Sequence, residues 1–260
     1  MRTLMAFLKL GLFLSWSALL VPPQMLVMLF RGRKPAYTIP RIWHKGVCRI
    51  LGLRVSIEGT PCTDRQVIFV ANHISYLDIP VIGSILKASF VAKGEVAGWP
   101  VFGFLSKLQQ TAFISRSKTT LGRDKNNLET MLKDGRSMII FPEGTSTDGR
   151  TVVPFKSSLF SIALNDDGTD IWLQPMTLSL LSVNGQSPTD QPLRDLYAWY
   201  GDMTLAPHLG AFGKAGGAHI RVTFHEPVRA RANPDRKYLA QTCYESVLKG
   251  LDKSELAIAA

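Results

Sequence analysis

Short apolar runs alternate with more polar stretches from residue 51 onward, and this pattern sets the expected architecture. Runs rich in Val, Ile, Phe and Leu have the length of buried strands, and the stretches between them have helical length. We expect strands at 54–57, 67–70, 89–92, 111–114, 137–141, 171–179 and 219–224, and helices at 79–87, 100–108, 119–133, 157–165, 192–200 and 234–250. Such alternation predicts an α/β fold with a mostly parallel central sheet flanked by helices.

The first fifty residues follow a different pattern. Residues 10–30 carry no charge, which is long enough to span a bilayer, but Pro22-Pro23 is expected to break the helix in the middle. A second helix is expected at about 38–52. We therefore predict two helices that anchor the chain to a membrane, as a hairpin or an interfacial pair. A single membrane span and a cleaved signal peptide are the alternatives.

The basic excess of the chain is confined to this N-terminal part. The formal net charge is +10, yet the first acidic residue is Glu58, and the chain after it is nearly balanced. Cations beside an apolar segment favour contact with anionic lipid headgroups, whereas a nucleic-acid-binding protein would carry them on a globular face. We divide the chain into a membrane-anchoring helical segment at 1–52 and an α/β domain at 53–260, and we expect no nucleic-acid partner.

The three cysteines Cys48, Cys62 and Cys243 are widely spaced, and the chain has no Cys-x-x-Cys pair or Cys/His cluster. This pattern indicates neither a disulfide framework nor a metal site. It favours a reducing location that faces the cytosol.

The most informative polar pair follows the strand expected at 67–70. His73 and Asp78 lie at a strand-to-helix junction, with Pro80 in the first turn of the next helix. Positions five apart are about 140° apart on an ideal helix, so His73 must precede the helix and Asp78 must lie near its start. A carboxylate on one imidazole nitrogen fixes the tautomer, and the other nitrogen can then take a proton from an alcohol. The alternative is that Asp78 only caps the helix.

Further polar residues follow other expected strands. Lys93 and Arg116 each end a strand, Glu143 and Gly144 follow a third, and Lys156 precedes the helix expected at 157–165. In a parallel sheet these strand ends meet at one edge, where α/β proteins bind ligands. A guanidinium there can hold a phosphate or carboxylate, and a glycine permits close backbone approach. Each residue also fits an ordinary surface role.

Together these segments resemble the 1-acylglycerol-3-phosphate acyltransferase family. The run from His73 to Asp78 looks like its His-x4-Asp motif, and Arg116 in Phe-Ile-Ser-Arg looks like its second motif. Its third motif is similar to Phe141-Pro142-Glu143-Gly144-Thr145, and its fourth to Gln174-Pro175-Met176. The resemblance covers about residues 40–225.

This resemblance implies transfer of a fatty acyl group from a thioester on acyl carrier protein or coenzyme A to the hydroxyl of a lysolipid. It implies no cofactor, no metal and no acyl-enzyme, and it places the protein on a membrane, at the cytoplasmic face of the inner membrane. His73 would act as the general base and Asp78 would orient it. The residues expected to hold the acceptor are Arg116, Glu143, Gly144, Thr145, Lys93 and Lys156.

One departure from the family concerns the acceptor. The third motif usually continues with an arginine that binds phosphate, and Ser146 stands here instead. The run 141–149 and the segment 198–203 resemble the subfamily that acylates lyso-ornithine lipid, which has no phosphate. We expect 1-acylglycerol-3-phosphate as the acceptor, with lyso-ornithine lipid as the alternative. A lipid hydrolase using Ser146 or Ser75, and a non-catalytic lipid-binding protein, are rival functions.

Overall fold

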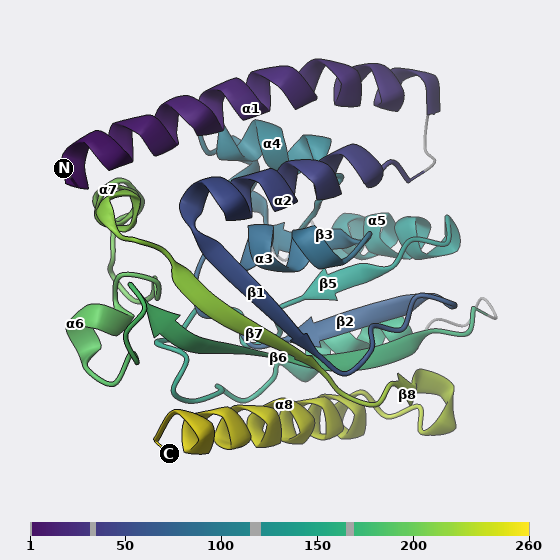
Figure 1. The fold of residues 1–260 in the computed structure, drawn as a ribbon. Coiled ribbons are helices and arrows are strands. Elements are labelled where there is room, and N and C mark those ends of the chain that lie inside the picture. The colour runs from purple at the N-terminus through teal and green to yellow at the C-terminus, as the bar shows by residue number, and fades with distance from the viewer. Residues whose placement is uncertain (1, 32–34, 115–120, 165–168, 260) are drawn as a thin grey trace.

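The fold is an α/β sandwich built on one mixed sheet. A computed structural model describes residues 2–31, 35–114, 121–164 and 169–259. The strands lie in the order β1-β7-β6-β2-β5-β3-β4, with β8 paired to β6 (Figure 1). Their bounds are β1 Leu53–Glu58, β2 Val67–Ala71, β3 Ser89–Lys93, β4 Ala112–Ile114, β5 Met138–Ile140, β6 Trp172–Val183, β7 Ala218–Phe224 and β8 Val228–Arg229.

Most neighbouring strands are parallel, as predicted. β2 pairs in parallel with both β5 and β6, β3 pairs in parallel with β5 and β4, and β1 pairs in parallel with β7. β7 and β8 run antiparallel to β6. The carboxyl ends of β2, β5, β3 and β4 therefore meet at one edge of the sheet.

Helices cover both faces of the sheet. The α-helices are α1 Arg2–Arg31, α2 Thr38–Leu51, α3 Asp78–Ile85, α4 Phe102–Leu108, α5 Leu121–Lys133, α6 Gln191–Arg194, α7 Leu205–Lys214 and α8 Arg236–Ala259, and the 3-10 helices are η1 Gly94–Gly98, η2 Ser157–Ala163 and η3 Ala230–Ala232. Val67, Phe69 and Ala71 of β2 face a core shared with α2, α3 and α7. Ile68 and Val70 face the opposite core, shared with α5, η2 and α8. A strand that is apolar on both faces forms a buried central strand of this kind.

The predicted break at Pro22-Pro23 is wrong, because α1 runs as one helix through both prolines. Proline removes the hydrogen bonds that would reach the carbonyls of Ala18 and Leu19. Both prolines lie on the exposed side of the helix. Just beyond them, the buried Gln24 side chain donates to the carbonyls of Ala36 and Leu108 and holds the second half of the helix against the domain.

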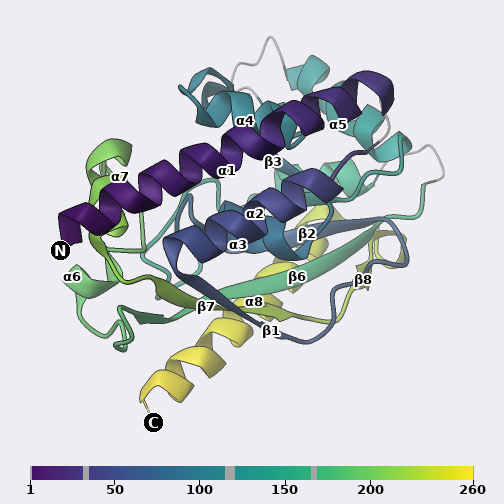
Figure 2. The same ribbon diagram turned by 45° about the horizontal axis from the view of Figure 1, so that its top comes forward.

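α1 packs along the domain for much of its length. Trp16 donates its indole N–H to the carbonyl of Trp43, and a Cβ on Gly46 of α2 would overlap the Trp16 ring, so only glycine permits this approach. Near the other end, Lys9 donates to the carbonyls of Leu51 and Ala215. Figure 2 shows α1 running alongside α2 and passing in front of α4. The second helix predicted at 38–52 is confirmed, and the domain boundary at residue 52 stays a prediction.

Only α1, among the described residues, is long and apolar enough to cross a membrane. Its outward side exposes a continuous series of apolar side chains: Leu4, Phe7, Leu8, Leu12, Leu19, Leu26, Leu29 and Phe30. α2 is amphipathic, with Lys45 and Arg49 exposed and Val47 and Cys48 buried. The membrane-anchoring role of the helix pair stays a prediction.

The helix predicted at 192–200 is wrong, because α6 ends at Arg194. The buried Arg194 guanidinium donates to the carbonyls of Pro188 and Asp148, and the chain then turns so that the Trp199 amide donates to the carbonyl of Ile74. These contacts replace helical ones. α7 follows at a place where the sequence analysis expected no helix.

Pro175 lies within β6, an interior strand, although a proline in a sheet is usually found on an edge strand or at a bulge. β7 pairs with β6 from Met176 onward and β8 pairs at Trp172 and Leu173, so Pro175 lies between the two partners. Its carbonyl accepts from the His225 amide on that side. Since the N–H and C=O of one strand residue point the same way, the missing N–H of Pro175 falls in this gap and no ladder bond is lost.

Candidate active site

His73 and Asp78 touch, as the sequence predicts. The Nδ1 atom of His73 lies 2.8 Å from Oδ2 of Asp78. His73 lies in the loop after β2, Asp78 is the first residue of α3, and the Asp78 carboxylate is fully buried while the His73 side chain is 21% exposed. The carboxylate therefore accepts a hydrogen bond from Nδ1–H of the imidazole, and Nε2 is left with a lone pair on the partly exposed side.

Asp78 is held by more than the histidine. Its Oδ2 atom accepts from the backbone amides of Ile74 and Ser75 at 2.7 and 3.0 Å, and its Oδ1 atom accepts from the Tyr197 hydroxyl at 2.9 Å. These donors compensate the burial of a charge. Burial, followed by the negative charge of Asp78, raises the pKa of Tyr197 well above its ordinary value, so this residue stays a hydroxyl donor.

Glu143 braces the backbone on either side of the site. It is almost fully buried, and its carboxylate accepts from the amides of His73 and Val153 at 2.7 and 2.8 Å. Burial raises the pKa of Glu143 to about 7, against the lowering effect of the two amides. The His73 carbonyl accepts from the Thr147 amide, so the loop after β5 holds the histidine main chain from both ends.

The imidazole itself rests on an aromatic ring. Phe141 stacks on His73 with ring centroids 4.1 Å apart and an interplanar angle of 21°, and Phe90 stacks on Phe141. Before the loop turns, the Asn72 side chain makes two hydrogen bonds with the backbone of Leu178. These contacts fix the ring plane and the start of the loop, which is the preorganisation that a positioned base requires.

All but one of the residues predicted to hold the acceptor can be placed relative to the strand edge at His73. Gly144 and Thr145 follow Glu143 in the loop after β5, and Thr145 is exposed. The Lys156 side chain covers Gly144, since a Cβ there would overlap its ammonium, and the positive φ of 70° also favours glycine. Lys93 ends the parallel strand β3 and is exposed. Arg116 lies outside the described residues, two positions after the end of β4.

Sequence reasoning missed Tyr197 and Asn72. Tyr197 is separated from Asp78 by 119 positions, and only the distinctive segment 198–203 drew attention to its neighbourhood. Asn72 precedes His73, but nothing in the sequence separates a buried asparagine from an exposed turn residue.

Neither serine proposed for a hydrolase bonds to His73. The Ser75 hydroxyl oxygen accepts from the Leu77 amide, and the Ser146 hydroxyl donates to the Trp199 carbonyl at 2.5 Å. In the part of the chain that the structure describes, no three His, Cys, Asp or Glu side chains gather as a metal site would require. Within the described residues the geometry thus pairs an imidazole with a buried carboxylate and bonds neither of these two serines to the ring.

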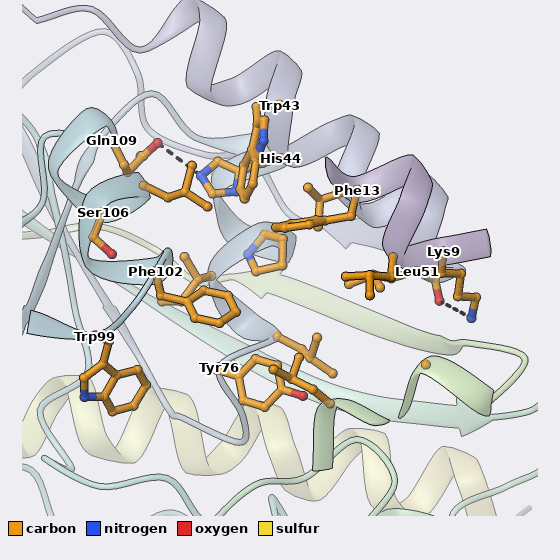
Figure 3. A pocket seen from close by; sticks show the side chains of 18 of the residues that line it. Lys9, Phe13, Trp43, His44, Leu51, Tyr76, Trp99, Phe102, Ser106 and Gln109 are labelled. Carbon is orange, nitrogen blue, oxygen red and sulfur yellow. Dashed lines mark hydrogen bonds between the residues drawn. The ribbon is translucent and has the colours of Figure 1, made fainter. Parts of the chain in front are cut away.

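A cavity of about 610 Å³ lies beside this centre, beneath α1. Tyr76 and Leu77 from the loop before α3 line it, together with residues of α1, α2, α4 and α7. Figure 3 shows Phe13, Trp99 and Phe102 on its walls. A cavity of this size with mainly apolar walls fits a long hydrocarbon chain.

Comparison with known proteins places the chain in a family. A family model described as Acyltransferase matches residues 53–179. A lyso-ornithine lipid O-acyltransferase from Brucella abortus is 34% identical over 98% of this chain and 96% of its own length, and another from Rhizobium meliloti is 34% identical over 93% and 84%. A 1-acyl-sn-glycerol-3-phosphate acyltransferase from Neisseria meningitidis is 32% identical over 46% of this chain and 48% of its own length.

The fold has a relative among solved structures. The 1-acyl-sn-glycerophosphate acyltransferase of Thermotoga maritima superposes with a TM-score of 0.70 and covers 98% of this chain and 95% of its own, at 21% identity. That structural similarity supports the fold, whereas the type of reaction is inferred from the relatives that are similar in sequence. The chain therefore belongs to the Acyltransferase family and is an acyltransferase that acts on lysolipids.

Proposed function

We propose that this enzyme moves a fatty acyl group from an acyl thioester to the free hydroxyl of lyso-ornithine lipid. The observation that carries the proposal is the hydrogen-bonded pair of His73 and Asp78. The Nε2 atom of His73 lies on the partly exposed side of the ring, and no described serine is bonded to it. A base that lacks a protein nucleophile suits direct transfer to an alcohol that the substrate brings.

In the proposed reaction, Nε2 of His73 takes the proton of the acceptor hydroxyl. The resulting oxygen attacks the thioester carbonyl, and a tetrahedral intermediate forms. The carbon–sulfur bond then breaks, the imidazolium returns its proton to the leaving sulfur, and an ester and a free thiol are the products. Asp78 stabilises the imidazolium through Nδ1 and keeps the ring in the orientation that the transfer needs.

The apolar cavity is the proposed site for the acyl chain of the donor. Tyr76 and Leu77, which lie between the two catalytic residues in the chain, are among the residues that line it. A chain held there would place its thioester carbonyl near His73. We propose acyl carrier protein or coenzyme A as the carrier of the thioester, as the sequence predicts.

Ser146 supports lyso-ornithine lipid as the acceptor. It stands where an arginine would bind phosphate, and its hydroxyl is already bonded to the Trp199 carbonyl. Relatives named for this acceptor match at 31–37% identity over 79–98% of the chain. Relatives named for 1-acylglycerol-3-phosphate at 32% identity match over about half of it.

The second candidate acceptor is 1-acylglycerol-3-phosphate, which the sequence analysis placed first. The ammonium of Lys156 over Gly144 favours an anionic headgroup of some kind. A carboxylate of ornithine and a phosphate would both meet this cation, as well as Lys93 and Arg116. The cations therefore support an anionic acceptor without separating the two.

We propose that α1 lies on the membrane surface. The helix contacts the domain from Ala6, beside Gly213 of α7, to Gln24, so crossing a bilayer would require it to leave those contacts. Its exposed leucine and phenylalanine side chains would enter the lipid, and the lysolipid would reach the strand edge from there. The free cysteines and the thioester donors support the cytoplasmic face.

To test the proposed acceptor, purified protein is incubated with each of the two acceptors and the same acyl donor. Lysophosphatidate and lyso-ornithine lipid are presented in identical mixed micelles with palmitoyl acyl carrier protein, and each product is quantified by mass spectrometry. We expect the second acceptor to be acylated with the higher kcat/KM. Ser146→Arg is the matched variant, and it should move the ratio toward lysophosphatidate. Preference for lysophosphatidate by the wild-type protein would reject the proposed acceptor.

A further inference from the structure

A tyrosine from a distant part of the chain bonds to the carboxylate of the His73–Asp78 pair. The hydroxyl of Tyr197 donates to Oδ1 of Asp78 at 2.9 Å, and both side chains are fully buried. The other oxygen, Oδ2, accepts from Nδ1 of His73 and from the amides of Ile74 and Ser75. The loop after β2 thus serves one oxygen of Asp78, and Tyr197 serves the other.

The chain around Tyr197 is fastened to the same loop. The Trp199 amide donates to the carbonyl of Ile74, and the Trp199 carbonyl accepts from the Ser146 hydroxyl. The Tyr197 ring packs edge-on against Phe212 of α7, with ring centroids 6.3 Å apart. The phenol is therefore held beside the carboxylate through both its backbone and its ring.

The hydroxyl acts as the donor in this contact. Burial, followed by the negative charge of Asp78, raises the pKa of Tyr197 well above its ordinary value, so the phenol keeps its proton. Three N–H donors on Oδ2 favour the charged carboxylate, which can only accept. A hydrogen bond to a buried charge is among the stronger ones in proteins.

A donor on Oδ1 weakens the attraction of Asp78 for the imidazolium. Hydrogen bonding to the charged form of a carboxylate lowers its affinity for a proton. Asp78 then stabilises the protonated ring of His73 less strongly, and Nε2 gives up its proton at lower pH. Because the two groups are coupled, this change belongs to the pair and not to either residue.

Three further titratable side chains near the pair stay uncharged at neutral pH. Cys48 of α2 and Tyr76 keep their protons, because burial raises the pKa of the thiol to about 12 and that of the phenol above its ordinary value. His208 of α7, which bonds to the Tyr76 hydroxyl, stays neutral because burial lowers its pKa.

Two ionisable side chains lie on the loop after β5 and on the segment before η2. Glu143 bonds to the His73 amide, and burial raises its pKa to about 7, so it titrates in the same pH range as an imidazole. Lys156 is exposed, and its ammonium covers Gly144. The effect of Tyr197 must therefore be measured with Glu143 present and absent.

We propose that Tyr197 is a positioning residue that lowers the proton affinity of the His73–Asp78 pair, so that Nε2 is free at neutral pH to accept the proton of the acceptor hydroxyl. Because it is fully buried, Tyr197 acts through Asp78. The inference rests on the proposed function, in which His73 is the general base.

The first test compares Tyr197→Phe with wild type, because this variant keeps the ring and removes the donor. The value of kcat/KM for lyso-ornithine lipid is measured from about pH 5.5 to 9, and we expect the midpoint of its acid limb to rise by about one pH unit. The loss of activity should therefore be largest at low pH. Tyr200→Phe, which loses a hydroxyl bonded to Asp195 and Gln191, is the matched control and should keep the wild-type midpoint.

Activity lost equally at every pH, with an unchanged midpoint, would show a purely structural role and overturn the inference. The same upward shift should appear when Tyr197→Phe is added to Glu143→Gln. A shift that disappears in that background would belong to Glu143 and would also overturn the inference.

A second measurement needs no turnover. In protein labelled with nitrogen-15 histidine, the signals missing from His73→Ala identify His73, and their titration is followed without substrate. The midpoint should be about one pH unit higher in Tyr197→Phe than in wild type. In Tyr197→3-fluorotyrosine, a stronger donor of nearly the same size, it should be lower, and this variant decides alone if Tyr197→Phe does not fold.

Equal midpoints in the wild type and the variants would overturn the inference. If the wild-type protein does not acylate lyso-ornithine lipid, the proposed function fails, and the titration of His73 still decides the role of Tyr197.

Discussion

The strand edge around His73 and the cavity beneath α1 are built in opposite ways. At the strand edge a short stretch of chain holds a polar pair, and Asp78 receives four donors. The cavity is assembled from α1, α2, α4, α7 and the loop before α3, and most of its walls are apolar side chains. The first region fixes the position of atoms, and the second would exclude water from the acyl chain that we propose it holds.

This difference shows that proton transfer and binding of the hydrocarbon chain make different demands on the protein. Proton transfer needs a base placed to within a fraction of an ångström, so the polar region is hydrogen-bonded throughout. Binding a hydrocarbon chain depends on apolar area, which many arrangements of side chains can supply. Changes to His73 or to the groups that fix its position should therefore alter kcat, and changes beneath or on α1 should alter binding. The following predictions test that division, beginning with the largest expected effect.

His73→Ala should reduce acyl transfer by roughly 10³–10⁴-fold, because the general base is lost. Membrane binding and the thermal unfolding temperature should stay near the wild-type values. The rate of thiol release measures acyl transfer, and sedimentation with vesicles measures membrane binding. His219→Ala, on β7, is the matched control and should keep activity. Transfer within tenfold of wild type in His73→Ala would break the assignment.

Glu143 should make the protein less stable as the pH rises from 4.5 to 7. Its folded pKa is raised to about 7 by burial, while the ordinary value is 4.5, so the folded state keeps its proton when the unfolded state has lost it. The free energy of unfolding should fall by up to about 3 kcal/mol across this window. Urea unfolding at several pH values measures it.

Glu143→Gln should flatten that pH dependence, even if the variant is less stable overall. Glu95→Gln, an exposed site on η1, is the control and should keep the wild-type slope. Equal slopes for wild type and Glu143→Gln would show that another group is responsible.

Charges on the outward side of α1 should weaken membrane binding. Leu12 and Leu19 are 56% and 64% exposed, and the change of both to Glu should lower partition into anionic vesicles roughly a hundredfold. Turnover of detergent-dispersed substrate should change little, because the inner side of α1 keeps its contacts. Ile57→Glu on β1 is the matched control. A lower kcat in micelles would show that α1 also affects the chemical step, and it would contradict the separation of catalysis from binding.

Lys156→Ala should raise the KM for the acceptor three- to tenfold and leave kcat nearly unchanged, since the residue is exposed and its charge is screened by solvent. Lys237→Ala on α8 is the control. The same assay on Arg116→Ala tests the one predicted acceptor residue that lies outside the described part of the chain. An unchanged KM in both variants would move the acceptor headgroup away from this edge.

The polar region was largely predictable from the sequence. Val67–Val70 is apolar on both faces, so the strand, the junction after it and the contact of His73 with Asp78 follow from local pattern. The contacts that could not be predicted there are made by residues far from His73 in the sequence. Tyr197 reaches Asp78 only because the helix expected at 192–200 ends early, and Glu143 turned out to brace the backbone.

The cavity was not predictable. Pro22-Pro23 suggested a break, yet contacts on both sides keep α1 in one piece over the cavity. α7 contains Pro207, Gly210 and Gly213, which weaken the helical signal, and packing against α1 stabilises it. The cavity is lined by Gln24, His44 and Gln109 from three distant parts of the chain, and no spacing in the sequence connects them.

The central claim is that the lipid, and no side chain, supplies the attacking oxygen. The most direct measurement incubates wild-type enzyme with a palmitoyl thioester in the absence of acceptor, and follows intact protein mass and free thiol over several turnover times. The account predicts an unmodified chain and no stoichiometric burst of thiol. A mass increase of one palmitoyl group, with one equivalent of thiol released per chain, would contradict it.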